Sequence, residues 1–359
     1  MENKIVMEIL NNTVNNISDI DRALMLKAQK RLDNLTKPVK SLGRLEELAK
    51  LIVGISGKDD PEIKNKVIFT FASDHGVAAE NVSAFPQEVT AQMVYNFLRG
   101  GAAVNILADH AGARVVIADL GVASILTPHP RLIERKINMG TKNMAKGPAM
   151  TRAEAIRSIE TGIDIFEREL KLGIDICAIG EMGIANTTAS SALAAVFTKK
   201  KIEEITGKGT GICDVSLKKK ISVIKRALKI NLPDPKDPID TLSKVGGFEI
   251  GALAGIILSA ASHRIPVVLD GFISGAAALI AYNIEPKTKN YMIPSHCSVE
   301  TGHKHILKYL GIKPLFDLSL RLGEGTGAAI GITLVEAAVK ILTQMATFKN
   351  AGVSQKNEK

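Results

Sequence analysis

Short apolar runs that are rich in β-branched residues alternate along this chain with longer stretches of helical spacing. Strands that are connected through helices are predicted to pair in parallel, with right-handed crossovers. We therefore expect an α/β fold with a doubly wound, mostly parallel, Rossmann-like sheet. The expected strands cover residues 66–74, 113–121, 174–181, 265–271 and 290–295, and the expected helices between them cover residues 88–112, 151–173, 187–200, 251–264 and 328–348.

The length of 359 residues allows one large domain or two domains. Hydrophobic residues make up 46% of the chain and aromatic residues only 4%, so the core must be aliphatic, which suits a sheet covered by helices on both faces. We predict a large α/β catalytic domain over residues 60–335 and a small helical subdomain from residues 1–59 and 336–359.

The small subdomain is expected to begin with a helix over residues 19–35, for which Ser18 and Asp21 resemble a capping box. A second helix over residues 41–57 is expected to end at Gly54 or Gly57. The last twelve residues, FKNAGVSQKNEK, are typical of a frayed polar tail.

Charge and cysteine usage exclude several classes of protein. The net charge of +9 is spread over scattered basic residues without interleaved aromatic residues, which favours a solvated surface over nucleic-acid binding. Three widely separated cysteines do not form a disulfide framework. No secretory h-region and no run of about 18 uncharged apolar residues is present, so we expect a cytoplasmic protein that does not bind membranes.

Ligands of open parallel sheets bind beyond the carboxyl ends of the strands, so the turns that follow the strands are the places to search. The first such turn, FASDHGVAAENVSAFPQEV, contains Asp74 and His75. After the strand that ends at Gly180 and Glu181, Asn186 and Thr187 open a helix whose free amides and dipole favour an anion. Local backbone capping is an alternative role for the polar side chains at both turns.

Two further glycine-rich turns are candidate ligand sites. Gly207, Gly209 and Gly211 with Thr210 resemble a phosphate-binding loop, and Lys220 follows early in the next helix, where a solvated lysine is the ordinary alternative. Glu324 stands between glycines where a strand-like run, FDLSL, gives way to a helix. The glycines leave this carboxylate little steric cover, although an acid that merely stabilises a helix N-terminus is the alternative.

The turn after the strand at 265–271 carries Asp270, which is followed by Ser274 and Gly275, a pair that suits either an anion or close helix packing. The segment SHCSVETGHKH contains His296, Cys297 and two further histidines. Their spacing is not that of a zinc site, and adjacent residues in a strand point to opposite faces, so we predict neither a metal site nor a Cys–His pair.

Seven segments together resemble one enzyme family, the nicotinate-nucleotide–dimethylbenzimidazole phosphoribosyltransferases. They are SLGRLEELA, SDHGV, GEMGIANTT, SKVGGFE, LDGFISGAAAL, IPSHCS and RLGEGTGAA, and they span about residues 20–345. One departure is visible, because Lys40 stands where the family has a glycine before SLGRLE.

The resemblance implies a glycosyl transfer. The 5-phosphoribosyl group of nicotinate mononucleotide moves to 5,6-dimethylbenzimidazole, nicotinate leaves, and α-ribazole 5′-phosphate forms for the lower ligand of cobalamin. By similarity Glu324 matches the catalytic base, and Glu181 and Lys220 match further active-site positions. The resemblance also implies a homodimer.

The residues fit this chemistry independently. The leaving nicotinate departs as a neutral ring and needs no general acid, whereas the attacking azole loses its N–H proton, so one carboxylate suffices as the base. We therefore predict Glu324 as general base and Glu181 as a stabiliser of the oxocarbenium-like ribose. No pyrophosphate leaves, so we predict no metal and no cofactor. The predicted substrate-binding residues are Phe85, Pro86, Met93, Gly180, Met182, Gly183, Asn186, Thr187, Gly209, Thr210, Gly211, Lys220, Leu322, Gly323 and Gly325.

Three alternatives stay open at this point. The same transfer to another azole or a purine is compatible with a flat apolar slot. A non-catalytic nucleotide-binding or nucleic-acid-binding protein predicts binding without turnover. A dinucleotide-dependent oxidoreductase lacks support, because no GxGxxG follows the first strand.

Overall fold

One six-stranded parallel sheet organises the computed structural model, which describes residues 7–354. The strand order is β3-β2-β1-β4-β5-β6, so the chain moves outward from β1 in one direction and from β4 in the other. This reversal between β1 and β4 is the switch point of a doubly wound sheet, and the predicted fold class is confirmed. The strands are β1 Lys66–Ser73, β2 Ala113–Gly121, β3 Leu132–Glu134, β4 Ile176–Met182, β5 Val267–Leu269 and β6 Met292–Pro294.

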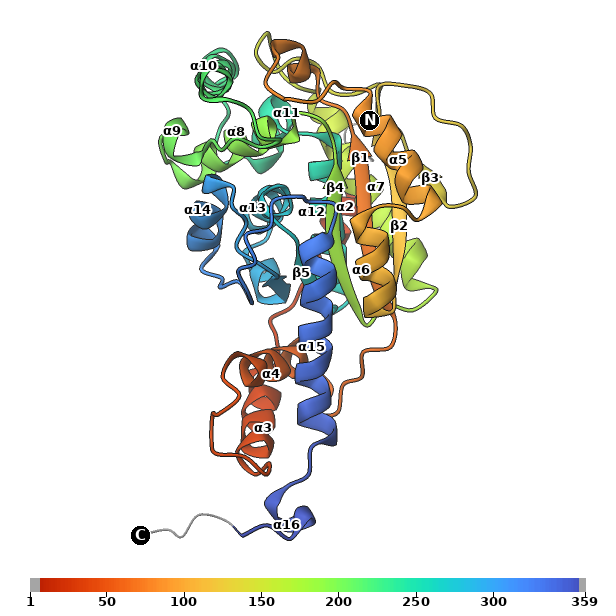
Figure 1. Cartoon of the computed structure of the whole chain (residues 1–359), viewed down its shortest axis with the longest axis vertical. Coiled ribbons are helices and arrows are strands. Elements are labelled where there is room, and N and C mark those ends of the chain that lie inside the picture. Colours follow the sequence, from red (N-terminus) through yellow and green to blue (C-terminus); the bar gives the residue numbers. More distant parts are fainter. Residues whose placement is uncertain (1–6, 355–359) are drawn as a thin grey trace.

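Helices cover both faces of the sheet (Figure 1). Phe69 and Ile179 point to one face, and their neighbours Ile68 and Ala178 point to the other, as the alternation of side chains in a strand requires. The first face packs on α2 Glu8–Asn15, α7 Arg152–Leu170, α8 Asn186–Thr198, α12 Phe248–Ser262 and α13 Phe272–Ile284. The second face packs on α4 Arg44–Ser56, α5 Val89–Arg99, α6 Ala103–Ala111 and α15 Thr326–Gln344.

The remaining helices lie along the connections between these elements. They are α3 Arg22–Asp33, α9 Ile202–Ile205, α10 Asp214–Asn231, α11 Pro238–Val245, α14 Thr301–Leu310 and α16 Phe348–Ala351, with 3₁₀ turns η1 at Gly76–Glu80 and η2 at Pro286–Tyr291.

Several sequence-based boundaries were wrong. The expected helix over residues 88–112 is two helices, because Gly100 adopts φ +81° and ends α5 before α6 begins. The FDLSL run is not a strand: it is irregular, and Phe316 forms a single bridge with His296. The expected tail begins with a helix instead, α16, in which the Thr347 hydroxyl accepts a hydrogen bond from the Asn350 amide. Residues 355–359 of that tail lie outside the described part of the chain.

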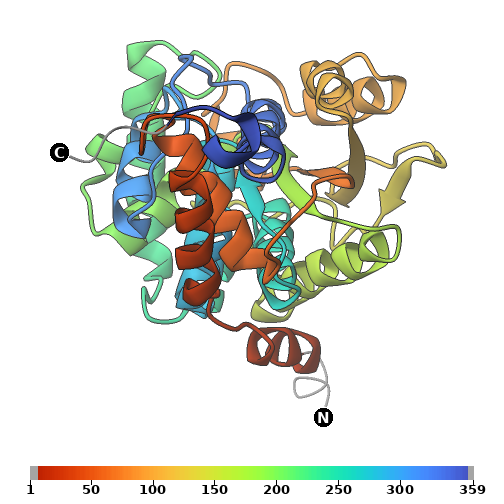
Figure 2. The same cartoon turned by 90° about the horizontal axis from the view of Figure 1, so that it is seen from below.

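Helices α3 and α4 pack beside the far half of α15, beyond the end of the sheet (Figures 1 and 2). The N-cap of α3 is Asp21, whose carboxylate accepts a hydrogen bond from the Leu24 amide at 2.9 Å. The predicted capping box of Ser18 and Asp21 was therefore wrong. Gly57, at φ +67°, ends α4 as expected. Helix α2 lies elsewhere, against α7 and α12. The division into two domains stays a prediction, because α15 runs through the expected boundary.

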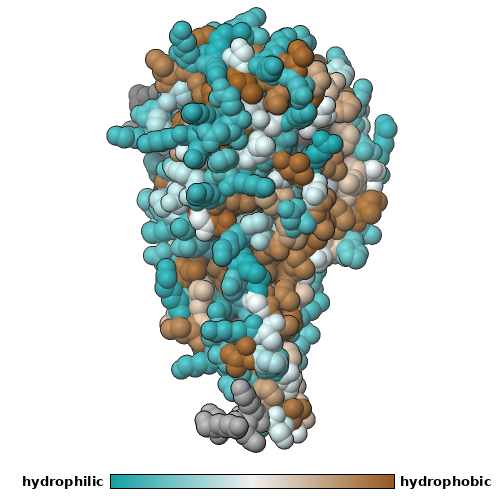
Figure 3. All heavy atoms as spheres, turned by 60° about the vertical axis from the view of Figure 1, so that its left-hand side comes forward, coloured by the Kyte–Doolittle hydropathy of each residue, from teal (hydrophilic) through white to brown (hydrophobic). Residues whose placement is uncertain are grey.

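Helix α15 is long and apolar enough, by length and composition, to cross a bilayer, but 56% of its apolar window is buried inside the protein, where it packs on α4, α6 and β4. That is the ordinary position of a core helix. On the face shown in Figure 3, hydrophilic residues are interspersed with hydrophobic ones.

Candidate active site

A cavity of about 460 Å³ opens where the chain leaves the carboxyl ends of the strands. Its wall combines the turns after β1, β4, β5 and β6 with the glycine-rich loop before α10 and the segment before α15. It therefore lies at the edge of the sheet where a doubly wound fold binds its ligands. The lining residues are Phe85, Glu181, Met182, Gly183, Ile184, Asn186, Thr187, Gly209, Thr210, Gly271, Phe272, Ile273, His296, Ser298, Glu300, Ser319, Leu320, Arg321, Leu322 and Gly323.

The turn at Glu324 has three consecutive residues in the left-handed region: Gly323 at φ +85°, Glu324 at +65° and Gly325 at +96°. Only glycine adopts that region without cost, so the two flanking glycines are required and Glu324 is strained. The Thr70 hydroxyl donates to the Glu324 carbonyl at 3.0 Å. Despite the bare flanks, only 5% of Glu324 is accessible, because the turn is pressed against β1 and β4.

Glu181 is the second-last residue of β4 and lines the cavity. One of its carboxylate oxygens accepts a hydrogen bond from the Asn186 amide group. A side chain at Gly323 would meet the other oxygen at 2.6 Å, so Glu181 lies directly against the Glu324 turn. The two carboxylates therefore share one buried neighbourhood.

Burial dominates the acidity of both carboxylates. It raises the pKa of Glu181 well above its usual range, and the charges of Glu249 and Asp270 add to the effect. Burial, and then the charge of Asp270, raise the pKa of Glu324 to about 7. At neutral pH Glu324 is thus poised between its two protonation states, which is the condition for an efficient general base.

Lys220 lies in α10 with only 1% of its surface accessible, so the ordinary alternative of a solvated lysine was wrong. Its ammonium donates to the Thr187 hydroxyl at 2.8 Å, at the start of α8. Burial lowers the pKa of Lys220 to about 8, against the opposing charge of Glu300. Glu300 also accepts from the Gly209 amide at 2.8 Å, which ties the glycine-rich loop to the segment after β6.

Behind the cavity, His75 and Glu249 form a buried pair with Nε2 and Oε1 at 2.7 Å. Burial opposes the charged imidazole, but the charge and hydrogen bond of Glu249 outweigh it and raise the pKa of His75. The Asp74 carboxylate accepts a hydrogen bond from the Ala123 amide at 2.8 Å. This contact is the backbone capping that was the alternative role for the polar side chains of this turn. The pair thus joins the β1 turn to the start of α12.

Comparison with known proteins agrees with this geometry. A family model described as "Phosphoribosyltransferase" matches residues 17–353. A nicotinate-nucleotide–dimethylbenzimidazole phosphoribosyltransferase of Desulforudis audaxviator is 55% identical over 97% of this chain and 99% of its own length. The chain belongs to the nicotinate-nucleotide–dimethylbenzimidazole phosphoribosyltransferase family.

Other members of this family support the assignment. The protein of that name from Geobacter metallireducens is 54% identical over 97% of this chain and 99% of its own length. The crystal structure of the Thermus thermophilus phosphoribosyltransferase superposes with a TM-score of 0.89 at 43% identity, covering 94% of this chain and all of the other.

Within this phosphoribosyltransferase, the cavity brings together part of the predicted site. Phe85, which is 53% accessible, lines the cavity, whereas Met93 packs against the core from α5. The predicted residues in the cavity wall are Phe85, Glu181, Met182, Gly183, Asn186, Thr187, Gly209, Thr210, Leu322 and Gly323. Those outside the wall are Pro86, Met93, Gly180, Gly211, Lys220, Glu324 and Gly325.

Most of the residues outside the wall lie directly behind it. Gly180 touches the peptide between Glu324 and Gly325, and Lys220 lies beneath Thr187. Sequence reasoning did not place Glu300 and His296 in the wall. His296 lies in the family segment IPSHCS and Glu300 follows it, so the sequence contained a hint of both positions. The contact between Glu300 and the Gly209 amide, however, depends on the fold.

Lys40, where the resemblance implies a glycine, adopts φ +63°. The left-handed region costs an ordinary residue about 1–2 kcal/mol, so this backbone conformation favours glycine.

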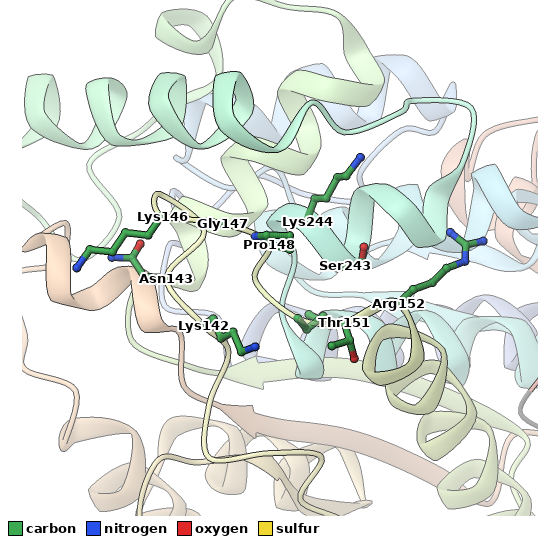
Figure 4. A pocket seen from close by; sticks show the side chains of 10 residues that line it. Lys142, Asn143, Lys146, Gly147, Pro148, Thr151, Arg152, Ser243 and Lys244 are labelled. Carbon is green, nitrogen blue, oxygen red and sulfur yellow. The ribbon is translucent and has the colours of Figure 1, made fainter. Parts of the chain in front are cut away.

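A second cavity, of about 450 Å³, lies between the loop over residues 142–152 and the end of α11 (Figure 4). Its basic side chains do not converge: Lys146 and Arg152 point away from each other in Figure 4. Arg152 pairs with Asp237 at 2.7 Å and Lys244 with Asp240 at 2.9 Å. None of its lining residues follows a strand of the sheet directly, so we place the active site at the first cavity.

Proposed function

We propose that this enzyme transfers the 5-phosphoribosyl group of nicotinate mononucleotide to 5,6-dimethylbenzimidazole or a related base. The products are nicotinate and α-ribazole 5′-phosphate, the nucleotide of the lower ligand of cobalamin. The observation that carries the proposal is the 55% identity, over nearly the full length of both chains, to a relative that bears the name of this activity. We also propose a cytoplasmic homodimer that needs no metal or cofactor and binds neither nucleic acid nor membranes.

Glu324 is the proposed general base. As one azole nitrogen attacks the ribose carbon, the ring becomes cationic and its N–H proton is lost, and a carboxylate with a pKa near 7 accepts that proton at neutral pH. Glu181 is the rival for this role because it lines the cavity and Glu324 does not. One oxygen of Glu181 already accepts a hydrogen bond from the Asn186 amide group, so we assign the proton transfer to Glu324.

Glu181 is the proposed stabiliser of the ribose. The pyridinium ring of nicotinate mononucleotide brings a positive charge to the cavity, and a nearby positive charge favours the ionised form of a carboxyl group. An ionised Glu181 then stabilises the oxocarbenium-like charge as the bond to nicotinate breaks. Attack from the side opposite the leaving group inverts the anomeric centre from β to α.

The 5′-phosphate is proposed to bind between the start of α8 and the glycine-rich loop. Thr187 and Thr210 line the cavity there, and the N-terminus of α8 favours an anion. Lys220 supplies positive charge from beneath through its hydrogen bond to Thr187. The Thr210 hydroxyl accepts from the Ala84 amide at 3.0 Å, so this loop and the turn carrying Phe85 are tied together.

The test is incubation with nicotinate mononucleotide and a panel of benzimidazoles, purines and phenols. Release of nicotinate is expected to depend on the acceptor, and the panel identifies the preferred base. Glu324→Gln is expected to keep the fold and both binding affinities while kcat falls about 10²-fold or more, as for a lost general base. Glu134→Gln, an exposed position at the end of β3, is the matched control. Near-normal turnover by Glu324→Gln, with loss in Glu181→Gln, would reverse the two roles.

A further inference from the structure

Asp270 follows β5 directly and holds the start of α15. Its Oδ2 accepts from the Gly325 amide at 3.0 Å and its Oδ1 from the Ala328 amide at 3.1 Å. The residue at the N-cap of α15 is Gly325, which has no side chain to satisfy these amides. A carboxylate 55 residues away in sequence therefore caps the helix that Glu324 precedes.

The backbone of the Glu324 turn is strained and stays in place only through contacts with its surroundings. A non-glycine residue in the left-handed region costs about 1–2 kcal/mol, so Glu324 stays there only while its surroundings impose it. Three strands supply the constraint. Thr70 on β1 donates to the Glu324 carbonyl, Gly180 on β4 packs against the following peptide, and Asp270 after β5 binds the Gly325 amide. Of these three, only Asp270 carries charge.

When Asp270 is ionised, its charge acts on Glu324 without a neutralising partner. The nearest basic group to Asp270 is His296, whose Nε2 lies 3.8 Å from Oδ1, and burial lowers the pKa of His296, which leaves it neutral at pH 7. Burial raises the pKa of Asp270 to about 7, and the amides of Gly325, Ala328 and Gly327 oppose the rise by stabilising its anion.

Several other titratable groups lie on the elements that surround the Glu324 turn. Glu181 lies on β4, Glu249 on α12 with its partner His75 after β1, and Glu300 before α14 with Lys220 on α10. His75 is held by Glu249, and Lys220 faces Thr187 and Glu300. Neither cation is paired with Asp270 in the described part of the chain.

We propose that Asp270 is a positioning residue for the transfer, which holds the Glu324 turn through the amides of α15 and sets how strongly Glu324 binds the azole proton. This rests on the proposed role of Glu324 as the base. Asp270 does not line the cavity and acts through Glu324. The negative charge favours protonation of Glu324, which makes it a stronger base during proton transfer. The amide contacts keep its backbone in one conformation.

The test compares the pH dependence of kcat in four forms of the full-length enzyme, with saturating substrates and an azole that stays unprotonated above pH 5. In Asp270→Asn the charge is lost, Glu324 releases its proton more readily, and the acid limb of the profile is expected to move to lower pH by about 0.5–1 unit. The plateau of kcat is expected to fall about 3–10-fold, as for a weaker and less fixed base. The Michaelis constants are expected to change less than twofold.

Thr70→Val is the matched control, because it removes a contact to the same turn without changing charge. It is expected to lower kcat with the acid limb unmoved. An unmoved limb in Asp270→Asn overturns the inference and shows that the residue is only a helix cap. Asp270→Ser, a neutral residue that still caps helices, replaces it if the asparagine variant does not fold. Failure of both to fold also counts against a role confined to one turn.

Glu324→Gln, the fourth form, separates the two hypotheses. If it retains turnover, the assignment of the base is wrong whatever Asp270 does. If it is inactive and Asp270→Asn has the profile of the unmodified enzyme, only the role of Asp270 is wrong.

Discussion

Gly180 offers a direct test of how closely the Glu324 turn must be placed. A Cβ atom added to Gly180 would lie under 3.0 Å from the carbonyl carbon of Glu324 and the nitrogen of Gly325. Both are backbone atoms, so no flexible side chain can yield. Restoring an ordinary contact of 3.4 Å requires the peptide to move by about 1 Å. A displacement of about 1 Å at a reacting group costs about 10²-fold in rate.

We therefore expect Gly180→Ala to lower kcat about 10-fold to 100-fold. Overpacking in the sheet is also expected to lower stability by about 1–3 kcal/mol. The assay is acceptor-dependent release of nicotinate, measured with each substrate at saturation and below, alongside a thermal melt. The azole and nucleotide Michaelis constants are expected to change little, because Gly180 lies behind the cavity wall rather than in it.

Gly147→Ala is the matched control. A Cβ at Gly147 meets no atom within 4 Å, so this variant is expected to keep both activity and stability. Full activity of Gly180→Ala, with its melt unchanged, would refute the reasoning. It would mean that the Glu324 turn tolerates displacement and that its geometry does not limit the reaction.

Three further outcomes follow from individual sites. Lys220→Met is expected to raise the Michaelis constant for nicotinate mononucleotide about tenfold or more while the azole constant stays within twofold, and equal effects on both would contradict a phosphate role. Lys40→Gly is expected to raise the free energy of unfolding by about 0.5–1 kcal/mol because it relieves a left-handed residue, and a chemical denaturation curve measures this. Burial raises the pKa of Glu160, which accepts from the Leu10 amide, to about 7. The folded protein thus binds this proton more tightly than the unfolded chain, so stability is expected to fall as pH rises from about 4.5 to 7, and Glu160→Gln should flatten that slope in melts.

Much of the fold could be read from local patterns. The runs at 66–74, 113–121 and 174–181 became the three longest strands, since β-branched residues in a short apolar run suit a strand buried on both faces. The three-residue strand β3 has no such run and was missed. Its pairing with β2 depends on where the chain returns after β2, which no local pattern records.

The candidate site divides in the same way. Two of the seven family segments contain Glu181 and Glu324, and glycine spacing indicated the loop at residues 207–211. The burial of Lys220 was not visible, since its own helix is mostly polar and the cover comes from Thr187 and Glu300, far away in sequence. Nor did spacing indicate that, of the predicted substrate-binding residues Phe85, Pro86 and Met93, only Phe85 lines the cavity.

The order of apolar and polar residues by itself determined that this chain forms a doubly wound parallel sheet, because strand and helix periodicities are local properties. Seven short segments of the sequence indicated the family and hence the reaction that we propose. Only the tertiary structure decided the acidity and the orientation of Glu324. These depend on burial, on Thr70 in β1, on Gly180 in β4 and on Asp270 after β5. Electrostatic and packing energies are set by distances in space rather than along the chain.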